Sequence, residues 1–286
     1  MQIHKIPYTL SIIILFCIFI LISTCSRAVA EAPFDVFVVY YPYDFTGHTK
    51  DFSPRPGYAS WTIERMERDI KRMADNCIHG ALLALAPEDL ADSHKLFMLR
   101  RFLDIVSTNS GNFKVILLIS PLQRMQLGRR NVVSYIENKG VTTHKAYYST
   151  NGKPLICFSE NVILTEEESG DYEYMNVHLG YLSSETDFSP ALPVSRTSSG
   201  LLQFSWILPG YCAPQTSENN KRNWILKRKK ATAFKKSLKT ACQQKTPIIV
   251  INSWNGYYNG TAIEPNTLDD FLMMNTLGEF FEVKKK

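Results

Sequence analysis

Three carboxylates follow predicted strands, and they are the side chains best placed to do chemistry. Asp44 lies just beyond the first strand, Glu160 at the end of the fourth and Glu264 beyond the last. The carboxyl ends of parallel strands meet at one opening, so we expect Asp44 and Glu160 to reach the same place. Two carboxyl groups there can act as a general acid and a general base. Glu264 is interpreted as an acceptor of backbone N–H bonds that holds its own loop.

Aromatic side chains gather at the same predicted strand ends. A flat ring can stack on the C–H face of a sugar while a hydroxyl or indole group bonds a sugar oxygen. The pattern therefore predicts a glycan-binding rim made by Tyr41, Tyr43, Trp206, Trp254, Tyr257 and Tyr258. For each of the two tryptophans taken alone, core packing is the more frequent explanation.

The elements that must position these residues alternate along the chain. Short β-branched or aliphatic runs are separated by longer amphipathic stretches, which is typical of parallel strands joined by crossover helices. Strands are predicted at 35–41, 81–86, 113–120, 153–158, 177–182, 201–207 and 247–254. Helices are predicted at 61–80, with Ser60 as the cap, and at 96–106, 132–137, 219–243 and 268–277.

Length and pattern together favour an α/β fold, a single-domain (β/α)8 TIM barrel over residues 31–286. The 256 residues of this range are close to the roughly 250 typical of such a barrel. Its eighth strand is expected between residues 209 and 217. Two smaller domains would also fit this length.

Residues 1–30 are predicted to be a signal peptide. Lys5 precedes an apolar run at 10–22, and Ala28-Val29-Ala30 has the small-x-small pattern that signal peptidase accepts. We expect cleavage after Ala30 and release into the secretory-pathway lumen or outside the cell.

The alternative is a retained signal anchor that tethers the protein to a membrane. The uncharged stretch at 6–26 is long enough to cross a bilayer of about 30 Å. A bacterial lipoprotein attached at Cys25 is a third possibility, for which Thr24 is a poor preceding residue.

Composition excludes several classes of protein. The net charge of +5 does not demand a nucleic-acid partner. Four cysteines lie beyond the leader, and they form no CxxC pair: Cys77, Cys157, Cys212 and Cys242. One or two disulfides are possible in an oxidising compartment, but zinc and redox sites have little support. The sequence has no HExxH, GxSxG or Walker pattern, so neither a metal nor a cofactor is predicted.

One segment is strongly basic. Residues 221–239 hold nine basic residues and no acidic one. Apolar residues recur within it at spacings of three, four or seven, as on an outer barrel helix buried along one side. The segment is therefore interpreted as a solvated basic face.

The peptide after the last strand resembles glycoside hydrolase family 99, the endo-α-mannosidases, and the related WbsX-like barrels. Their last strand runs S-(F/W)-N-E-(W/Y)-x-E-G-(T/S)-x-(I/L)-E, and this chain has SWNGYYNGTAIEP at 253–265. The matching positions are Ser253, Trp254, Asn255, Gly260, Thr261, Ile263 and Glu264, with Pro265 matching the WbsX-like form. YYPY at 40–43 and NGKPLI at 151–156 resemble two further family segments.

The resemblance implies a TIM barrel that acts on α-linked glycans, with Asn255 as a polar anchor for the sugar. It also implies that Gly256 and Asn259 occupy the positions of the two catalytic Glu residues. Glycine has no proton acceptor, and an amide does not exchange a proton near neutral pH. Each lost group removes about 10²- to 10⁴-fold of rate, so the family reaction is expected to be absent or very slow.

Two functions remain after this departure. The first is a secreted pseudoenzyme that binds an oligosaccharide or a glycoprotein glycan. The second is an active glycoside hydrolase or glycosyltransferase in which Glu160 and Asp44 replace the lost pair. The two carboxyl groups of such enzymes lie about 5 to 9.5 Å apart. Asn259-Gly260-Thr261 is also an N-glycosylation sequon, and a glycan on Asn259 would cover the former catalytic centre.

Overall fold

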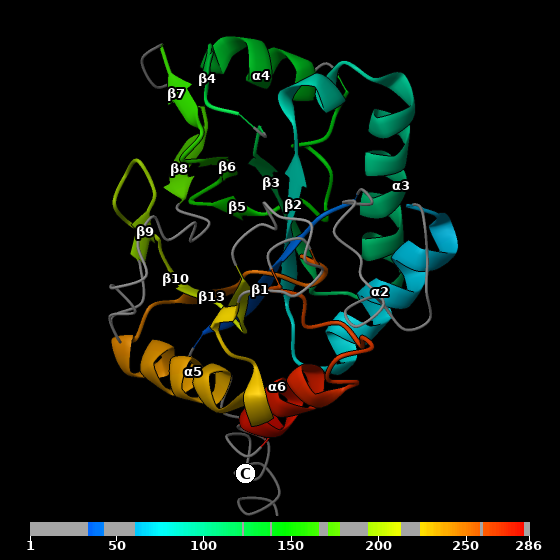
Figure 1. Cartoon of the computed structure of the whole chain (residues 1–286). Helices are drawn as coiled ribbons and strands as arrows, with labels where there is room; N and C mark the ends of the chain where they lie inside the picture. Colours follow the sequence, from blue (N-terminus) through cyan, green and yellow to red (C-terminus); the bar gives the residue numbers. More distant parts are fainter. Residues whose placement is uncertain are drawn as a thin grey trace, which may run out of the picture.

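The computed structural model describes residues 34–42, 61–121, 123–137, 139–165, 171–177, 194–212, 224–257 and 260–282. Within them the chain forms an α/β structure around a curled, mostly parallel sheet (Figure 1). The predicted signal peptide lies outside the described residues, as do Tyr43, Asp44, Tyr258 and Asn259. No helix in the described part is both long and apolar enough to cross a membrane.

Seven parallel strands form the sheet in the order β8-β6-β3-β2-β1-β13-β10. Their bounds are β1 Asp35–Tyr40, β2 Gly80–Leu85, β3 Lys114–Ile119, β6 Lys153–Ser159, β8 Glu173–Val177, β10 Gln203–Ile207 and β13 Ile248–Ile251. The predicted strands match these closely, except that β8 begins four residues before the expected start. The α/β class is thus confirmed.

The eighth strand lies elsewhere than predicted. β9, Val194–Arg196, pairs antiparallel with β10, and a single bridge joins Met175 of β8 to Thr197. At the predicted place, β11 (Tyr211–Cys212) forms a separate two-stranded sheet with β12 (Trp224–Leu226). The sequence signal for β9 is weak because the strand has only three residues. Across the described residues the sheet is therefore curled and does not form the closed barrel that the sequence predicts, since a single bridge and no continuous ladder joins β8 to the residue after β9.

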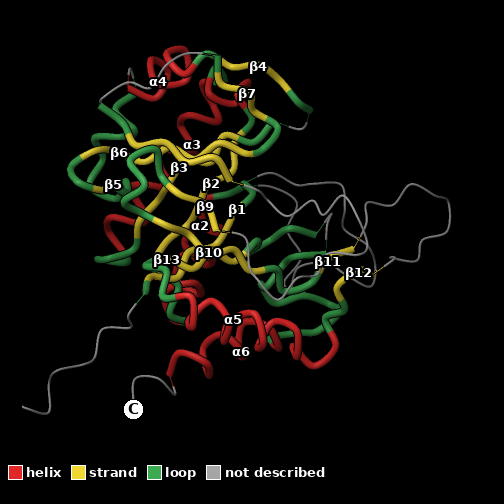
Figure 2. Tube along the Cα trace, turned by 90° about the vertical axis from the view of Figure 1, so that its left-hand side faces the viewer, coloured by secondary structure: helices red, strands yellow, loops and turns green. Residues whose placement is uncertain are grey.

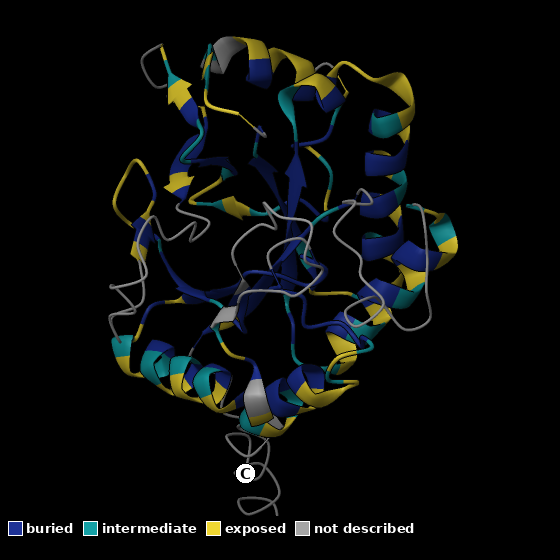
Figure 3. Ribbon diagram, in the orientation of Figure 1, coloured by how far each residue is buried: buried dark blue, intermediate teal, exposed yellow. Residues whose placement is uncertain are grey.

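Strand alternation divides the core into an inner and an outer layer. Phe37 and Val39 of β1 face inward and pack with inward residues from the other parallel strands. Val36, Val38 and Tyr40 face the surrounding helices. The strands are buried on both faces (Figure 3), as expected for a parallel sheet with helices outside and packed side chains within.

The helices lie outside the sheet (Figure 2). They are α2 Ile63–Asp75, α3 Ser93–Asn109, α4 Arg129–Glu137, α5 Thr232–Gln244 and α6 Leu272–Glu282, with short 3₁₀ turns η1 Pro87–Leu90 and η2 Lys229–Ala231. Short strands β4 (Met125–Leu127) and β7 (Val162–Leu164) pair with each other, and β5 (Ser149–Thr150) pairs with β6.

Two helix starts differ from the sequence prediction. Thr62, not Ser60, caps α2 by accepting the N–H of Arg65 at 3.3 Å. The basic helix begins at Thr232 and not at 219, because 224–226 is a strand and Lys230 and Ala231 adopt left-handed φ angles of 53°. Such angles interrupt a right-handed helix.

Cysteine pairing is also limited by the structure. Cys157 and Cys242 carry free thiols, so the disulfides considered from the sequence do not involve either of them. Cys157 lies in the inner core, and burial raises the pKa of its thiol well above the ordinary value. A buried, protonated thiol of this kind is a poor nucleophile.

Asp92 at the start of α3 should make stability depend on pH. Its carboxylate accepts the N–H groups of Lys95 at 3.1 Å and His94 at 2.9 Å, and these bonds lower its pKa. The stabilisation is present above the unfolded pKa and is lost as pH falls through the folded pKa. Asp92→Asn should be less stable than the parent at pH 7, and urea titrations should show this gap closing in acid. A gap independent of pH would contradict the assignment.

Candidate functional site

The segment after β13 folds back on itself as a tightly bonded loop, here called the motif loop, residues 252–264. Its two arms are joined by bonds from Ser253 N to Thr261 O at 3.1 Å and from Ile263 N to Ser253 O at 3.0 Å. Thr261 N also donates to Gly256 O at 2.8 Å. The loop is attached to the end of β1 by the bond from Trp254 N to Val39 O at 2.8 Å. The motif therefore sits at the carboxyl end of the sheet, as predicted.

Gly256 occupies a position without space for a side chain. A Cβ atom there would lie 2.2 Å from Ser253 Oγ and 2.3 Å from Thr261 Oγ1. These two hydroxyls are hydrogen-bonded to each other at 2.9 Å and are buried. Contacts below 3 Å cannot be accommodated without movement, so a side chain at this position would require the two hydroxyl groups to shift. The described loop is therefore packed tightly around the position where the resemblance places a catalytic Glu.

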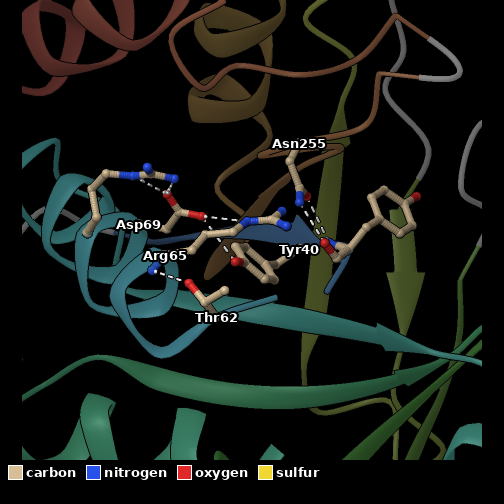
Figure 4. Close-up of polar contacts among 7 residues, drawn as sticks. Tyr40, Thr62, Arg65, Asp69 and Asn255 are labelled. Atoms are coloured by element: carbon tan, nitrogen blue, oxygen red, sulfur yellow. Dashed lines mark hydrogen bonds and ion pairs between the residues drawn. The ribbon is translucent and has the colours of Figure 1, made fainter. Parts of the chain in front are cut away.

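Asn255 bonds to the backbone of Tyr41. The Tyr41 N–H donates to Asn255 Oδ1 at 2.8 Å, and Asn255 Nδ2 donates to Tyr41 O at 2.6 Å. This reciprocal pair of hydrogen bonds holds the backbone of Tyr41, the residue that follows β1, against the motif loop (Figure 4). Both atoms of the amide are thus engaged by protein, and the role of Asn255 as a sugar anchor stays a prediction.

Glu264 is buried within the motif loop beside Tyr257. Its backbone N–H donates to Trp254 O at 2.9 Å, and the residue is only 1% exposed. Burial and then the charge of Glu264 hold the pKa of Tyr257 well above its ordinary value. The raised pKa keeps the Tyr257 phenol protonated and unable to act as a base at neutral pH. The interpretation of the Glu264 carboxylate as an acceptor of backbone N–H bonds stays a prediction.

Arg228, which sequence analysis did not select, clamps the motif loop. Its Nη1 donates to Gly260 O at 3.0 Å and its Nη2 to Ala262 O at 2.6 Å, while Nε pairs with Asp269 Oδ2 at 2.7 Å. The guanidinium is buried, and Gly210 packs against its stem. A lysine could not make this set of bonds, because only a guanidinium offers a planar fork of donors. The sequence feature that could have indicated this role is a single arginine among the lysines of residues 227–230.

A second cluster of polar side chains joins the last residue of β1 to helix α2. Tyr40 OH donates to Asp69 Oδ2 at 3.0 Å, and Arg65 and Arg68 of α2 pair with the same carboxylate at 3.5 and 3.2 Å (Figure 4). Burial raises the pKa of Asp69, and the two arginines oppose that shift. Burial and the nearby carboxylate raise the pKa of Tyr40. The cluster is a structural anchor that joins Tyr40, the first residue of the YYPY segment, to three residues of α2 that carry no motif.

The predicted aromatic rim divides in the structure. Tyr41 is half-buried and packs against the inner core at the carboxyl end of β1. Trp206 faces the inner core, and its indole N–H bonds Ser195 Oγ at 2.9 Å. Trp254 packs in the outer layer, and Tyr257 is buried inside the motif loop. This burial favours packing roles for both tryptophans, and among the described aromatic candidates Tyr41 is the residue that is partly exposed.

Glu160 stands where the sequence placed it, in the turn after β6. It is partly exposed, and the neighbouring Asn161 fixes this turn by donating from Nδ2 to Pro121 O at 3.1 Å. Its predicted partner Asp44 is outside the described residues, so their pairing stays a prediction. Among the residues that the structure describes, no group of three His, Cys, Asp or Glu side chains is arranged to hold a metal ion.

The fold of this chain is similar to that of solved glycoside hydrolases. The GH99 endo-α-mannosidase from Bacteroides thetaiotaomicron, solved in complex with bis-tris-propane, has a TM-score of 0.63 at 16% identity, covering 88% of this chain and 97% of that one. Another structure of that organism's GH99 endo-α-mannosidase gives 0.61 at 17%, with 87% and 97% covered.

A third solved structure, described as a glycoside hydrolase-like protein, has a TM-score of 0.57 at 10% identity and covers 87% of this chain and 94% of its own. No protein-family model and no curated protein matches the sequence. The resemblance read from the motif is thus confirmed as a likeness of fold to GH99 endo-α-mannosidase structures. This likeness of fold does not test the interpretation of Gly256 and Asn259 as replacements for two catalytic Glu residues.

Proposed function

We propose that this protein is a secreted, glycoside hydrolase-like protein that binds glycans and has lost hydrolysis or retains very little. The observation that carries the proposal is the packing at Gly256, where two bonded hydroxyls fill the space that a side chain would need. A merely missing Glu could be one substitution away from activity. In this loop the bond between Ser253 and Thr261 would also have to rearrange before that position could hold a Glu.

The partner is an oligosaccharide or a glycoprotein glycan that enters at the carboxyl ends of the strands. The fold likeness to GH99 endo-α-mannosidases supports a glycan of the α-mannoside class. Tyr41, held by Asn255, supplies a partly exposed ring at this end, and Tyr43 and Tyr258 are expected nearby in sequence. Stacking of one ring on a sugar contributes about 0.5–1.5 kcal/mol beyond its buried area.

The remaining parts of the proposal follow from the sequence. The curled sheet belongs to a complete (β/α)8 barrel. In that barrel, β8 and the segment around β9 pair more extensively than through the single bridge from Met175 to Thr197. Residues 1–30 direct the chain into the secretory pathway, and Asn259 receives a glycan there. That glycan would add bulk beside the altered catalytic position and further disfavour hydrolysis.

Titration with α-mannoside oligosaccharides tests the proposal. The parent chain should bind in a saturable manner and should release no product in a parallel chromatographic assay. Tyr41→Ala should weaken binding several-fold to about tenfold because a stacking ring is lost. Tyr135→Ala, at an exposed tyrosine of α4, is the matched control and should bind as the parent does. Equal binding by both variants would contradict the placement of the site.

The alternative, a hydrolase that uses Glu160 and Asp44, has one observation in its favour. Glu160 is partly exposed at the carboxyl end of β6, where acid–base groups of barrel enzymes stand. If the parent chain released product and Glu160→Gln reduced that rate by about 10²-fold or more, this alternative would replace the proposal.

A further inference from the structure

The positive charge of this protein is concentrated in one part of the chain. Residues 221–263 contain ten basic residues and no acidic one. The rest of the chain has 22 basic and 27 acidic residues, so the net charge of +5 arises entirely from this segment. Such a separation of charge directs one side of a protein toward an anionic partner.

Helix α5 presents much of this charge on one face. Lys235, Lys236 and Lys239 are exposed on the side opposite the buried Phe234 and Leu238. Three more exposed lysines flank the helix, namely Lys227, Lys230 and Lys245. None of these six lysines forms an ion pair with the described carboxylates, so their charge is not neutralised within the described fold.

Exposed apolar side chains lie next to this basic face. Leu268, Phe271 and Leu272 are 45%, 42% and 36% exposed. The 2.7 Å pair between Arg228 and Asp269 brings their turn beside the residues that lead into α5. Lysines combined with exposed aliphatic and aromatic side chains are typical of surfaces that lie on lipid headgroups. A sulfated polysaccharide would use the lysines and leave the apolar residues in water.

The chain enters the fold near Lys245, at the end of α5 opposite to the turn that holds Leu268. Asp35 N donates to Pro247 O at 2.8 Å, two residues after Lys245, and the Phe34 ring packs on Phe281 of α6 at 5.5 Å. α5 and α6 lie side by side at one end of the molecule (Figure 2). The segment that carries the apolar run at 10–22 is therefore joined to the described fold near Lys245, at one end of the basic face.

We propose that the face formed by these six lysines together with Leu268, Phe271 and Leu272 docks on an anionic lipid bilayer. The lysines attract the negative headgroups, and the apolar side chains enter the interfacial region. In a form that keeps its N-terminal segment, this face would lie against the membrane that holds the anchor. The inference is independent of glycan binding.

Vesicle cosedimentation of the full chain tests the proposal. Vesicles of phosphatidylcholine with about 30% phosphatidylserine should bind the parent chain at least about tenfold more tightly than pure phosphatidylcholine, and near 1 M salt should remove the difference. Lys235→Glu/Lys236→Glu/Lys239→Glu should weaken binding to the anionic vesicles by about 100-fold. Leu268→Ser/Phe271→Ser should weaken it several-fold.

The control variant reverses three exposed charges elsewhere, Arg100→Glu/Lys139→Glu/Lys145→Glu, and so changes the net charge by the same amount. It should keep most of the anionic-vesicle binding. Equal loss in both triple variants would show a mere net-charge effect and overturn the proposal. Equal binding of the parent to both vesicle types would overturn it, as would lysine-dependent binding to heparin with none to vesicles.

Discussion

Placing Glu at position 256 should destabilise the protein and should not produce a glycosidase. Even Gly256→Ala puts a Cβ atom 2.2 Å from Ser253 Oγ and 2.3 Å from Thr261 Oγ1. Overpacking of a tightly packed interior costs about 1–3 kcal/mol. The larger side chain of Gly256→Glu adds a carboxylate to a buried position, so its cost should exceed that of alanine. Urea unfolding gives the stability, and release of product from α-mannosides gives the activity.

A double-mutant cycle separates this steric effect from a general loss of stability. In the Ser253→Ala/Thr261→Ala background both clashing hydroxyls are gone, and Ser253 Cβ lies 3.4 Å from the new Cβ atom. The cost of Gly256→Ala should therefore fall by at least about 1 kcal/mol in that background, because contacting residues are not additive. The same cost in both backgrounds would mean that the loop relaxes easily and that glycine is not required there.

Removal of the Arg228 guanidinium should produce the largest loss of stability predicted for a single substitution in this protein. Arg228→Met leaves the carbonyls of Gly260 and Ala262 without their donor and leaves Asp269 buried and unpaired. Breaking a buried pair in this way costs about 3–5 kcal/mol. Arg228→Lys should recover only a part, because an ammonium group cannot span three acceptors held by a planar fork.

An exposed ion pair provides the matched control for Arg228. Lys71 and Asp75 are paired at 2.8 Å on α2, with side chains 76% and 59% exposed. Lys71→Met should change the free energy of unfolding by less than about 1 kcal/mol. Hydrogen exchange adds a local readout, since the amides of Thr261 and Ile263 should lose protection in Arg228→Met. If these amides kept their protection, the arginine would not be holding the loop.

The sequence predicts the parallel strands well because each is a short apolar run. β2 and β3 are six-residue segments with almost every side chain buried, which is the pattern of a sheet covered on both faces. β8 was predicted too late because it contains Glu173, which the sequence presents as a surface residue. In the structure, this carboxylate is buried and accepts Ser198 Oγ at 3.1 Å and Ser199 N at 3.2 Å.

The candidate site depends on contacts that a single sequence does not display. Its location after the last strand could be predicted from the motif. The partner of Asn255, by contrast, is a backbone group 214 residues earlier in the chain. Arg228 reaches carbonyl groups 32 and 34 residues away, and carbonyl groups have no sequence signature. The fit at Gly256 likewise comes from two hydroxyls whose approach is visible only in the folded loop.

A crystal structure of the parent chain with an α-mannoside oligosaccharide tests the central claim most directly. Our account predicts an intact glycan at the carboxyl ends of the strands, in contact with the Tyr41 ring, with no pair of carboxylates on either side of a glycosidic oxygen. A cleaved glycan, a sugar bound on another face, or two carboxyl groups about 5 Å apart across the bond would contradict it.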